Sequence, residues 1–136
     1  IGDGALSGGM AYEGLNTIAT LGTNAIIIIN DNDQSIAKNP KGGIYTALER
    51  LRETKGQTTN NIFKALGYDY HYLEDGNNLE ELISLFKEVK DIDHPVVLHI
   101  YTEKGKGFEP AEQNHEKFHA GGPFSLETGE YIKKVL

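Results

Sequence analysis

Apolar positions in the first thirty residues switch from helical to strand periodicity. Ile1 leads into a glycine-rich turn, after which apolar residues recur at helical spacing from Met10 to Leu21, and Gly22 ends the pattern. The segment Ala25 to Ile29 is apolar on both faces and mostly β-branched, which is typical of a buried central strand in a parallel sheet. We therefore predict a turn, a helix and a strand, in that order.

The same alternation continues to about residue 101. In chain order the pattern predicts a helix over 44–54, a short helix that ends at Leu66 and is capped by Asn60 or Asn61, a strand over 68–73, a helix over 79–89 capped by Asn77 or Asn78, and a strand over 96–101 that Pro95 opens. Strands that alternate with helices imply βαβ units. The predicted fold class is α/β, with a parallel sheet and helices on both faces.

Composition narrows the class of protein. The chain has 136 residues with 38% hydrophobic side chains, which fits one domain over residues 1–136. Its only methionine is Met10, so we interpret the chain as a fragment truncated at its N-terminus. A net charge of −7 argues against nucleic-acid or anionic-membrane partners. The absence of cysteine excludes disulfides, thiol nucleophiles and cysteine-ligated zinc. We expect a cytoplasmic protein.

Two polar segments follow predicted strands and suggest a metal site. Gly2-Asp3-Gly4 precedes a helix, and Asn32 follows the apolar strand. In open parallel sheets, ligands bind at the carboxyl ends of strands, and glycine turns before helices favour diphosphates. An aspartate beside a diphosphate requires a bridging cation, and Mg²⁺ prefers oxygen ligands such as those of Asp3 and Asn32. Either motif alone is more simply a turn, but together they favour a metal–diphosphate site.

A zinc hydrolase is the sharpest alternative from the residues alone. His115-Glu116-Lys117-Phe118-His119 spells H-E-x-x-H, in which a helix places two histidines on one zinc ion. The glycines and proline at 121–123 would end any such helix within two residues of His119, and the flanking residues are polar. We therefore regard the match to this zinc-binding motif as a coincidence of sequence.

Longer stretches carry a resemblance to a known family. The combination of Gly2-Asp3-Gly4, a helix, a buried strand and Asn32 resembles the thiamine-diphosphate motif of transketolase-like enzymes. The sequence is most similar to the first domain of the 1-deoxy-D-xylulose-5-phosphate synthase family. The similar segments are residues 2–16, 30–36, 104–112 and 118–120 (GDGALSGGMAYEGLN, NDNDQSI, KGKGFEPAE and FHA). The resemblance implies a partial thiamine-diphosphate-binding fold.

The resemblance also implies roles for individual residues. Asp3, Asn32 and the backbone carbonyl of Gln34 match the family's Mg²⁺ ligands, and the cofactor-contacting positions fall on Gly4, Ala5, Asn32 and Phe108. Phe108 stands where the family usually has a tyrosine, Gln34 replaces a frequent methionine, and residues 36–61 form a shorter segment than in many relatives. His119 matches a histidine that lines the substrate pocket, and is the catalytic candidate.

For the whole enzyme, the resemblance implies a transferase that uses thiamine diphosphate and Mg²⁺. It would condense pyruvate with glyceraldehyde 3-phosphate and release CO₂, in the biosynthesis of isoprenoid and thiamine precursors. The remaining domains of the same enzyme and a second copy, in a homodimer, are the implied partners, so we expect no turnover from the fragment alone. Another transketolase-like enzyme, or a non-catalytic fragment that binds a partner subunit, stays open as an alternative.

Overall fold

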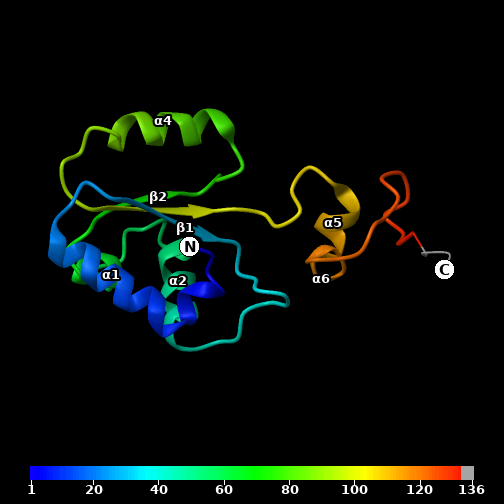
Figure 1. The fold of residues 1–136 in the computed structure, drawn as a ribbon, viewed down its shortest axis with the longest axis horizontal. Helices are drawn as coiled ribbons and strands as arrows, with labels where there is room; N and C mark the ends of the chain where they lie inside the picture. The colour runs from blue at the N-terminus through cyan, green and yellow to red at the C-terminus, as the bar shows by residue number, and fades with distance from the viewer. Residues whose placement is uncertain (133–136) are drawn as a thin grey trace. The chain divides into compact units, whose positions relative to one another are not determined.

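A computed structural model describes residues 1–132 of the chain, which divides after Thr102 into two compact units. The first unit contains every strand of the sheet and the helices that pack on it (Figure 1). Its strands are β1 (Ile26–Asp31), β2 (Asp69–Leu73) and β3 (Val96–Tyr101). All pairings are parallel and the order is β1-β3-β2, which confirms the predicted parallel sheet.

β3 is the middle one of the three strands. Five of its six residues are buried, and it takes a partner on each side. The outer side of β1 is met by the start of the chain, where the Ile1 amino group donates to the Ile28 carbonyl (2.7 Å) and Asn30 N–H donates to the Ile1 carbonyl (2.9 Å). β1 thus has β3 on one side and the backbone of Ile1 and Gly2 on the other, which agrees with the predicted inner position of residues 25–29. Helices that cover both faces make a strand apolar on both sides whatever its lateral position.

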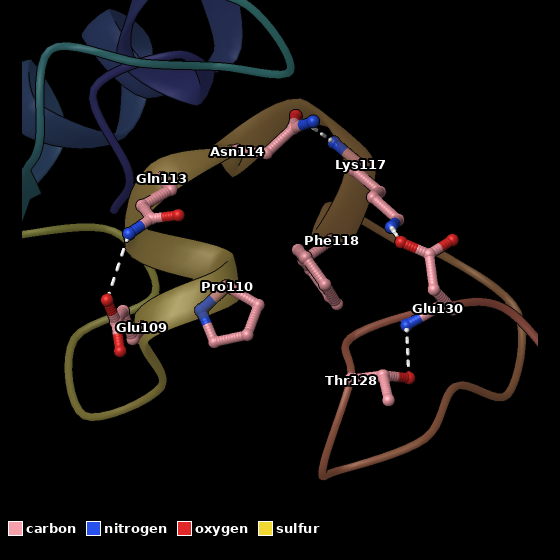
Figure 2. Close-up of a pocket in the computed structure, with 8 residues that line it drawn as sticks. All are labelled: Glu109, Pro110, Gln113, Asn114, Lys117, Phe118, Thr128 and Glu130. Carbon is pink, nitrogen blue, oxygen red and sulfur yellow. Dashed lines mark hydrogen bonds and ion pairs between the residues drawn. The ribbon is translucent and has the colours of Figure 1, made fainter.

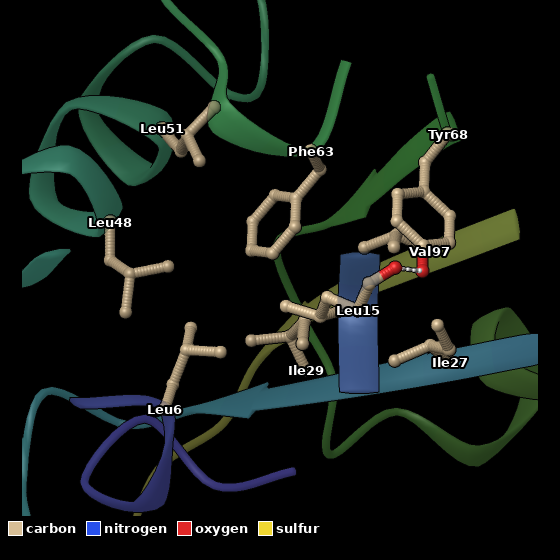
Figure 3. Packing of buried hydrophobic residues seen from close by; sticks show 9 residues of the cluster. All are labelled: Leu6, Leu15, Ile27, Ile29, Leu48, Leu51, Phe63, Tyr68 and Val97. Atoms are coloured by element: carbon tan, nitrogen blue, oxygen red, sulfur yellow. Dashed lines mark hydrogen bonds between the residues drawn. The ribbon is translucent and has the colours of Figure 1, made fainter. Parts of the chain in front are cut away.

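Helices cover both faces of the sheet. On one face, α1 (Gly9–Leu21), α2 (Gly43–Glu53) and α3 (Ile62–Ala65) pack against β1 and β3. Figure 3 shows this cluster, which is formed by Leu6, Leu15, Ile27, Ile29, Leu48, Leu51, Phe63, Tyr68 and Val97. On the other face, α4 (Leu79–Val89) buries Leu85 and Val89 against β3.

The helix ends follow the local sequence signals. Gly22 adopts a left-handed conformation (φ 63°) and its N–H donates to the Ile18 carbonyl, which ends α1. Asn61 and Asn78 cap α3 and α4, because each side chain accepts hydrogen bonds from two backbone N–H groups of the first turn. These asparagines satisfy donors that would otherwise lack partners, and so fix where the helices begin.

The second unit begins at Glu103 and has its own small apolar centre. It contains α5 (Glu109–Gln113) and α6 (His115–Phe118), neither of which was predicted as an element. The rings of Phe108, Phe118 and Phe124 lie 5.0–5.5 Å apart between centroids and make edge and tilted contacts. In residues 1–132, no helix has both the length and the apolar character that a membrane span requires.

Candidate metal and diphosphate site

The Gly2-Asp3-Gly4 turn lies against the carboxyl end of β1. Asp3 N–H donates to the Asn30 carbonyl at 3.1 Å, and Gly2 forms a parallel bridge with Asn30. A Cβ added at Gly4 would lie 2.8 Å from Ser35 Oγ, so only glycine allows the turn to approach the following loop this closely. The structure thus brings Asp3 and Gly4 beside the loop that carries Asn32.

The Asp3 carboxylate is buried with little compensation for its charge. The residue is 2% exposed, and its side-chain partner in the described structure is the Asn39 amide group. Burial is the main cause that raises the pKa of Asp3, and the negative charge of Asp31 adds to the rise. Hydrogen bonds from Asn39 and from the backbone N–H groups of Asp3 and Gly4 oppose it without cancelling it. Asn39 Oδ1 is itself buried and has no hydrogen-bond partner in the described part of the chain. A cation next to Asp3 would lower this cost.

Asn32 and Gln34 lie in the loop that leaves β1. Asn32 Oδ1 accepts a hydrogen bond from Gln34 N–H at 3.2 Å, and Gln34 forms an antiparallel bridge with Lys38. A carboxamide oxygen has a second lone pair, so this contact leaves Asn32 able to bind a metal. Both predicted ligands therefore lie in one ordered loop next to the Asp3 turn.

Ala5 opens a short 3₁₀ helix, η1 (Ala5–Ser7), ahead of α1. Gly4 and Ala5 are the first residues beyond Asp3, and Ala5 is exposed. A cavity of about 300 Å³ opens next to the loop, and its lining includes Asn39, Lys38 and Lys41. The lining also includes Asp33 and Glu49, and Lys38 lies 3.8 Å from Asp33, so the charges around this cavity are mixed.

A buried polar network under the loop was not anticipated from the sequence. Asp31 is 0% exposed, and both of its carboxylate oxygens accept from Arg52 Nη1, at 2.9 and 2.7 Å. His99 Nε2 lies 2.9 Å from Asp31 Oδ2, and Tyr70 Oη lies 2.7 Å from His99 Nδ1. Because a carboxylate only accepts, Nε2 carries the proton, and in the neutral ring Nδ1 accepts from Tyr70.

These contacts keep Asp31 ionised despite its burial. Desolvation, the largest effect, would raise the pKa of Asp31, but hydrogen bonds from His99 and Arg52 and the charge of Arg52 bring the pKa below its ordinary value. Burial raises the pKa of Tyr70 far above its ordinary value. A sequence signal did exist, since His99 is a polar residue inside an otherwise apolar strand and must have a buried partner.

Phe108 and His119 belong to the second unit. Phe108 contacts two other phenylalanine rings, and His119 is exposed at the C-cap of α6. The pocket of this unit, of about 390 Å³, is lined by side chains such as Pro110, Lys117 and Glu130 and includes neither predicted residue (Figure 2). Their roles toward cofactor and substrate stay predictions.

The H-E-x-x-H spelling does not form a zinc site. α6 ends at Phe118, and His119 leaves the helix with ψ 88°, so the two histidines do not occupy successive turns of one helix. Residues 1–132 contain no group of three His, Cys, Asp or Glu side chains that could hold a metal ion. The metal site predicted at Asp3 and Asn32 is of another kind, because its ligands include an amide and a backbone carbonyl.

Comparison with known families decides the relationship. The family model described as 1-deoxy-D-xylulose-5-phosphate synthase matches residues 1–60 and 43–102, which together include the Asp3 turn, the Asn32 loop and the whole sheet. The chain belongs to the 1-deoxy-D-xylulose-5-phosphate synthase family. The resemblance found in the sequence is thereby confirmed.

Curated relatives of the same name cover nearly the whole chain. The enzyme of Listeria monocytogenes serotype 4b is 44% identical over 140 residues, which cover 98% of this chain and 23% of the relative. The enzymes of Clostridium acetobutylicum and Aquifex aeolicus are 41% and 38% identical, each covering 98% of this chain and 27% of the relative. The chain therefore spans about a quarter of the length of these synthases.

The alignments also differ in length from the chain. The one with the Clostridium acetobutylicum synthase extends over 169 positions, whereas this chain has 136 residues. More than thirty of those positions thus have no counterpart here. The alignment length does not place this difference along the chain, so the shorter segment expected at residues 36–61 stays a prediction.

Proposed function

We propose that this chain is the diphosphate- and metal-binding part of a 1-deoxy-D-xylulose-5-phosphate synthase. The observation that carries the proposal is the buried carboxylate of Asp3, which lies next to the Asn32 loop and has hydrogen bonds but no cationic partner among residues 1–132. An isolated buried charge is unfavourable unless it is paired or binds a metal. Mg²⁺ fits here because every proposed ligand is an oxygen.

In this proposal, three groups of the chain hold the ion: the Asp3 carboxylate, the Asn32 side-chain oxygen and the Gln34 carbonyl. Gly4 and Ala5 place backbone next to the diphosphate, at the start of the short 3₁₀ helix η1. Thiamine diphosphate, when bound, supplies the carbanion chemistry. The protein's share at this end is to bind and orient the diphosphate.

The reaction proposed for the whole enzyme joins pyruvate to glyceraldehyde 3-phosphate and releases CO₂, giving 1-deoxy-D-xylulose 5-phosphate. The names of the relatives support this product. His119 is proposed to contact substrate and Phe108 to contact the cofactor ring. The other parts of the enzyme, a homodimeric state and a cytoplasmic location belong to the same proposal.

The test is calorimetric titration of thiamine diphosphate into the chain, in Mg²⁺ and in EDTA. We expect thiamine diphosphate to bind in the presence of Mg²⁺ and not in EDTA. Asp3→Asn should bind thiamine diphosphate at least tenfold more weakly, since removal of a ligand charge weakens metal binding. Asp93→Asn is the matched control, because that side chain is 99% exposed. Equal affinity with and without Mg²⁺, or no binding by the folded chain, would contradict the proposal.

A further inference from the structure

Arg52 contacts the carboxylates on both sides of Asn32. Its Nη1 donates to Asp31, and its Nη2 lies 3.1 Å from Asp33 Oδ1. Asp31 is the last residue of β1, whereas Asp33 is already in the loop. One guanidinium from α2 therefore joins the rigid strand to the loop, with the proposed metal ligand between the two contacts.

The backbone of the loop is fixed at the same place. Asp33 N–H donates to Asp31 Oδ1 at 3.1 Å, and Thr102 N–H donates to the Asp31 carbonyl at 2.8 Å. Asp33 has a left-handed conformation (φ 57°), which non-glycine residues adopt only at some cost. The contacts to Asp31 and Arg52 hold Asp33 in this conformation, and thus hold Asn32 at the turn.

Stability alone does not account for such a network. Replacing a buried ion pair by apolar residues of similar volume is often neutral or stabilising, so its presence is weak support for a purely stabilising role. A planar guanidinium that bonds two carboxylates does, however, define geometry, because its donors are fixed relative to each other. The outer partners of metal ligands commonly determine metal affinity in this way.

We propose that Arg52 is a positioning residue for the metal site, which orders the Asp31–Asp33 turn so that the oxygens of Asn32 and Gln34 face the ion. His99 adds to this support because it binds the Asp31 carboxylate, and Tyr70 in turn binds His99. This inference rests on the proposed function, since it assumes that the turn binds Mg²⁺. In this proposal Arg52 acts through Asp31 and Asp33 and is not itself a ligand of the ion.

The test uses the ¹⁵N-labelled chain and Mg²⁺ alone, followed by amide chemical shifts, which detect even weak binding. In the wild type we expect the amides of Asp3, Asn32 and Gln34 to shift with Mg²⁺. Arg52→Lys keeps the positive charge but cannot contact both carboxylates in the same way, so we expect about tenfold weaker affinity. Arg50→Lys is the matched control, because Arg50 is an exposed arginine of the same helix.

A second measurement separates positioning from stability. Without metal, ¹⁵N order parameters at residues 32–34 should fall in Arg52→Lys and stay unchanged in Arg50→Lys. Urea unfolding establishes that each variant is folded during the titration. If Arg52→Lys does not fold, Asp33→Asn replaces it and should weaken Mg²⁺ binding several-fold. This variant weakens the contact of Asp33 with Arg52 and its longer ion pair with the exposed Lys38, and it leaves the Arg52–Asp31 pair intact.

The outcomes distinguish this inference from the proposed function. Equal Mg²⁺ affinity and equal order at residues 32–34 in the wild type and in Arg52→Lys would overturn the positioning role and leave the metal site intact. The absence of Mg²⁺-induced shifts at Asp3 and Asn32 in the wild type would overturn the proposed site, and the positioning role with it. Weaker binding in Arg52→Lys, with a normal control, would establish the role.

Discussion

Two aspartates at the carboxyl end of β1, Asp3 and Asp31, are equally buried but differently surrounded. Asp3 is 2% exposed and Asp31 is 0% exposed. Asp31 has Arg52 and His99 as partners and a lowered pKa, whereas Asp3 has the Asn39 amide and a raised pKa. The protein itself balances the charge of Asp31 through Arg52 and His99, and in our proposal this pairing also supports the metal-binding turn. The charge of Asp3 is left for a ligand to balance.

The largest effect is expected when the balanced aspartate is changed. Asp31→Asn removes the carboxylate that pairs with Arg52 and leaves a guanidinium whose side chain is only 13% exposed. Breaking one side of a buried pair costs about 3–5 kcal/mol. Urea unfolding of Asp31→Asn should show a loss of this size. A loss no larger than that of Asp93→Asn would show that Arg52 does not depend on Asp31.

The matching change at Asp3 should have the opposite sign. Asp3→Asn removes a buried charge that has no cationic partner among residues 1–132. We therefore expect the free energy of unfolding of the metal-free chain to rise by about 0.5–1 kcal/mol, as is common when a strained functional site is relieved. The same variant should lose the stabilisation that Mg²⁺ with thiamine diphosphate gives the wild type. Thermal unfolding with and without these ligands measures both effects. Destabilisation of the metal-free Asp3→Asn chain would contradict the comparison.

The contact between the Asp3 turn and the loop should tolerate little extra volume. In Gly4→Ala, the new Cβ would meet Ser35 Oγ at 2.8 Å and Ser35 Cβ at 3.0 Å. We expect a loss of about 1 kcal/mol in the free energy of unfolding, because overpacking forces neighbouring atoms to move. The double variant Gly4→Ala with Ser35→Gly should recover most of it in a double-mutant cycle. Additive losses would show that the two residues are not in contact.

The smallest effect concerns the tyrosines near His99. Burial, with a smaller effect from Glu74, raises the pKa of Tyr72 to about 12, above the value near 10 that an unfolded chain would show. The folded state therefore binds the Tyr72 proton more tightly than the unfolded chain does. The contribution of this proton to the free energy of unfolding is complete below pH 10 and is lost as the pH rises toward 12. Absorbance at 295 nm against pH, for the wild type and Tyr72→Phe, measures the titration. A Tyr72 transition near pH 10 would contradict this prediction.

Much of the fold could be predicted because its signals are local. The left-handed Gly22 and the capping side chains of Asn61 and Asn78 lie where the sequence placed helix ends. Asp3 and Asn32 could be selected from their positions after strands, and the structure does bring their segments together. The helices of the second unit are only four or five residues long and show too few turns for a periodic pattern. The equally short α3 was predicted from its capping asparagine, and the corresponding signal of Asn114 before α6 was missed.

The sequence by itself determined the α/β class, most element boundaries and the family, because these depend on neighbouring residues and on the residues that make up short motifs. Only the tertiary structure decided that β3 is central, since periodicity records which faces are covered and not which strand lies between the others. The same holds for Asp3 and Asp31. Whether a buried carboxylate is balanced depends on Arg52, His99 and Asn39, which are distant in the chain and meet only in the folded protein.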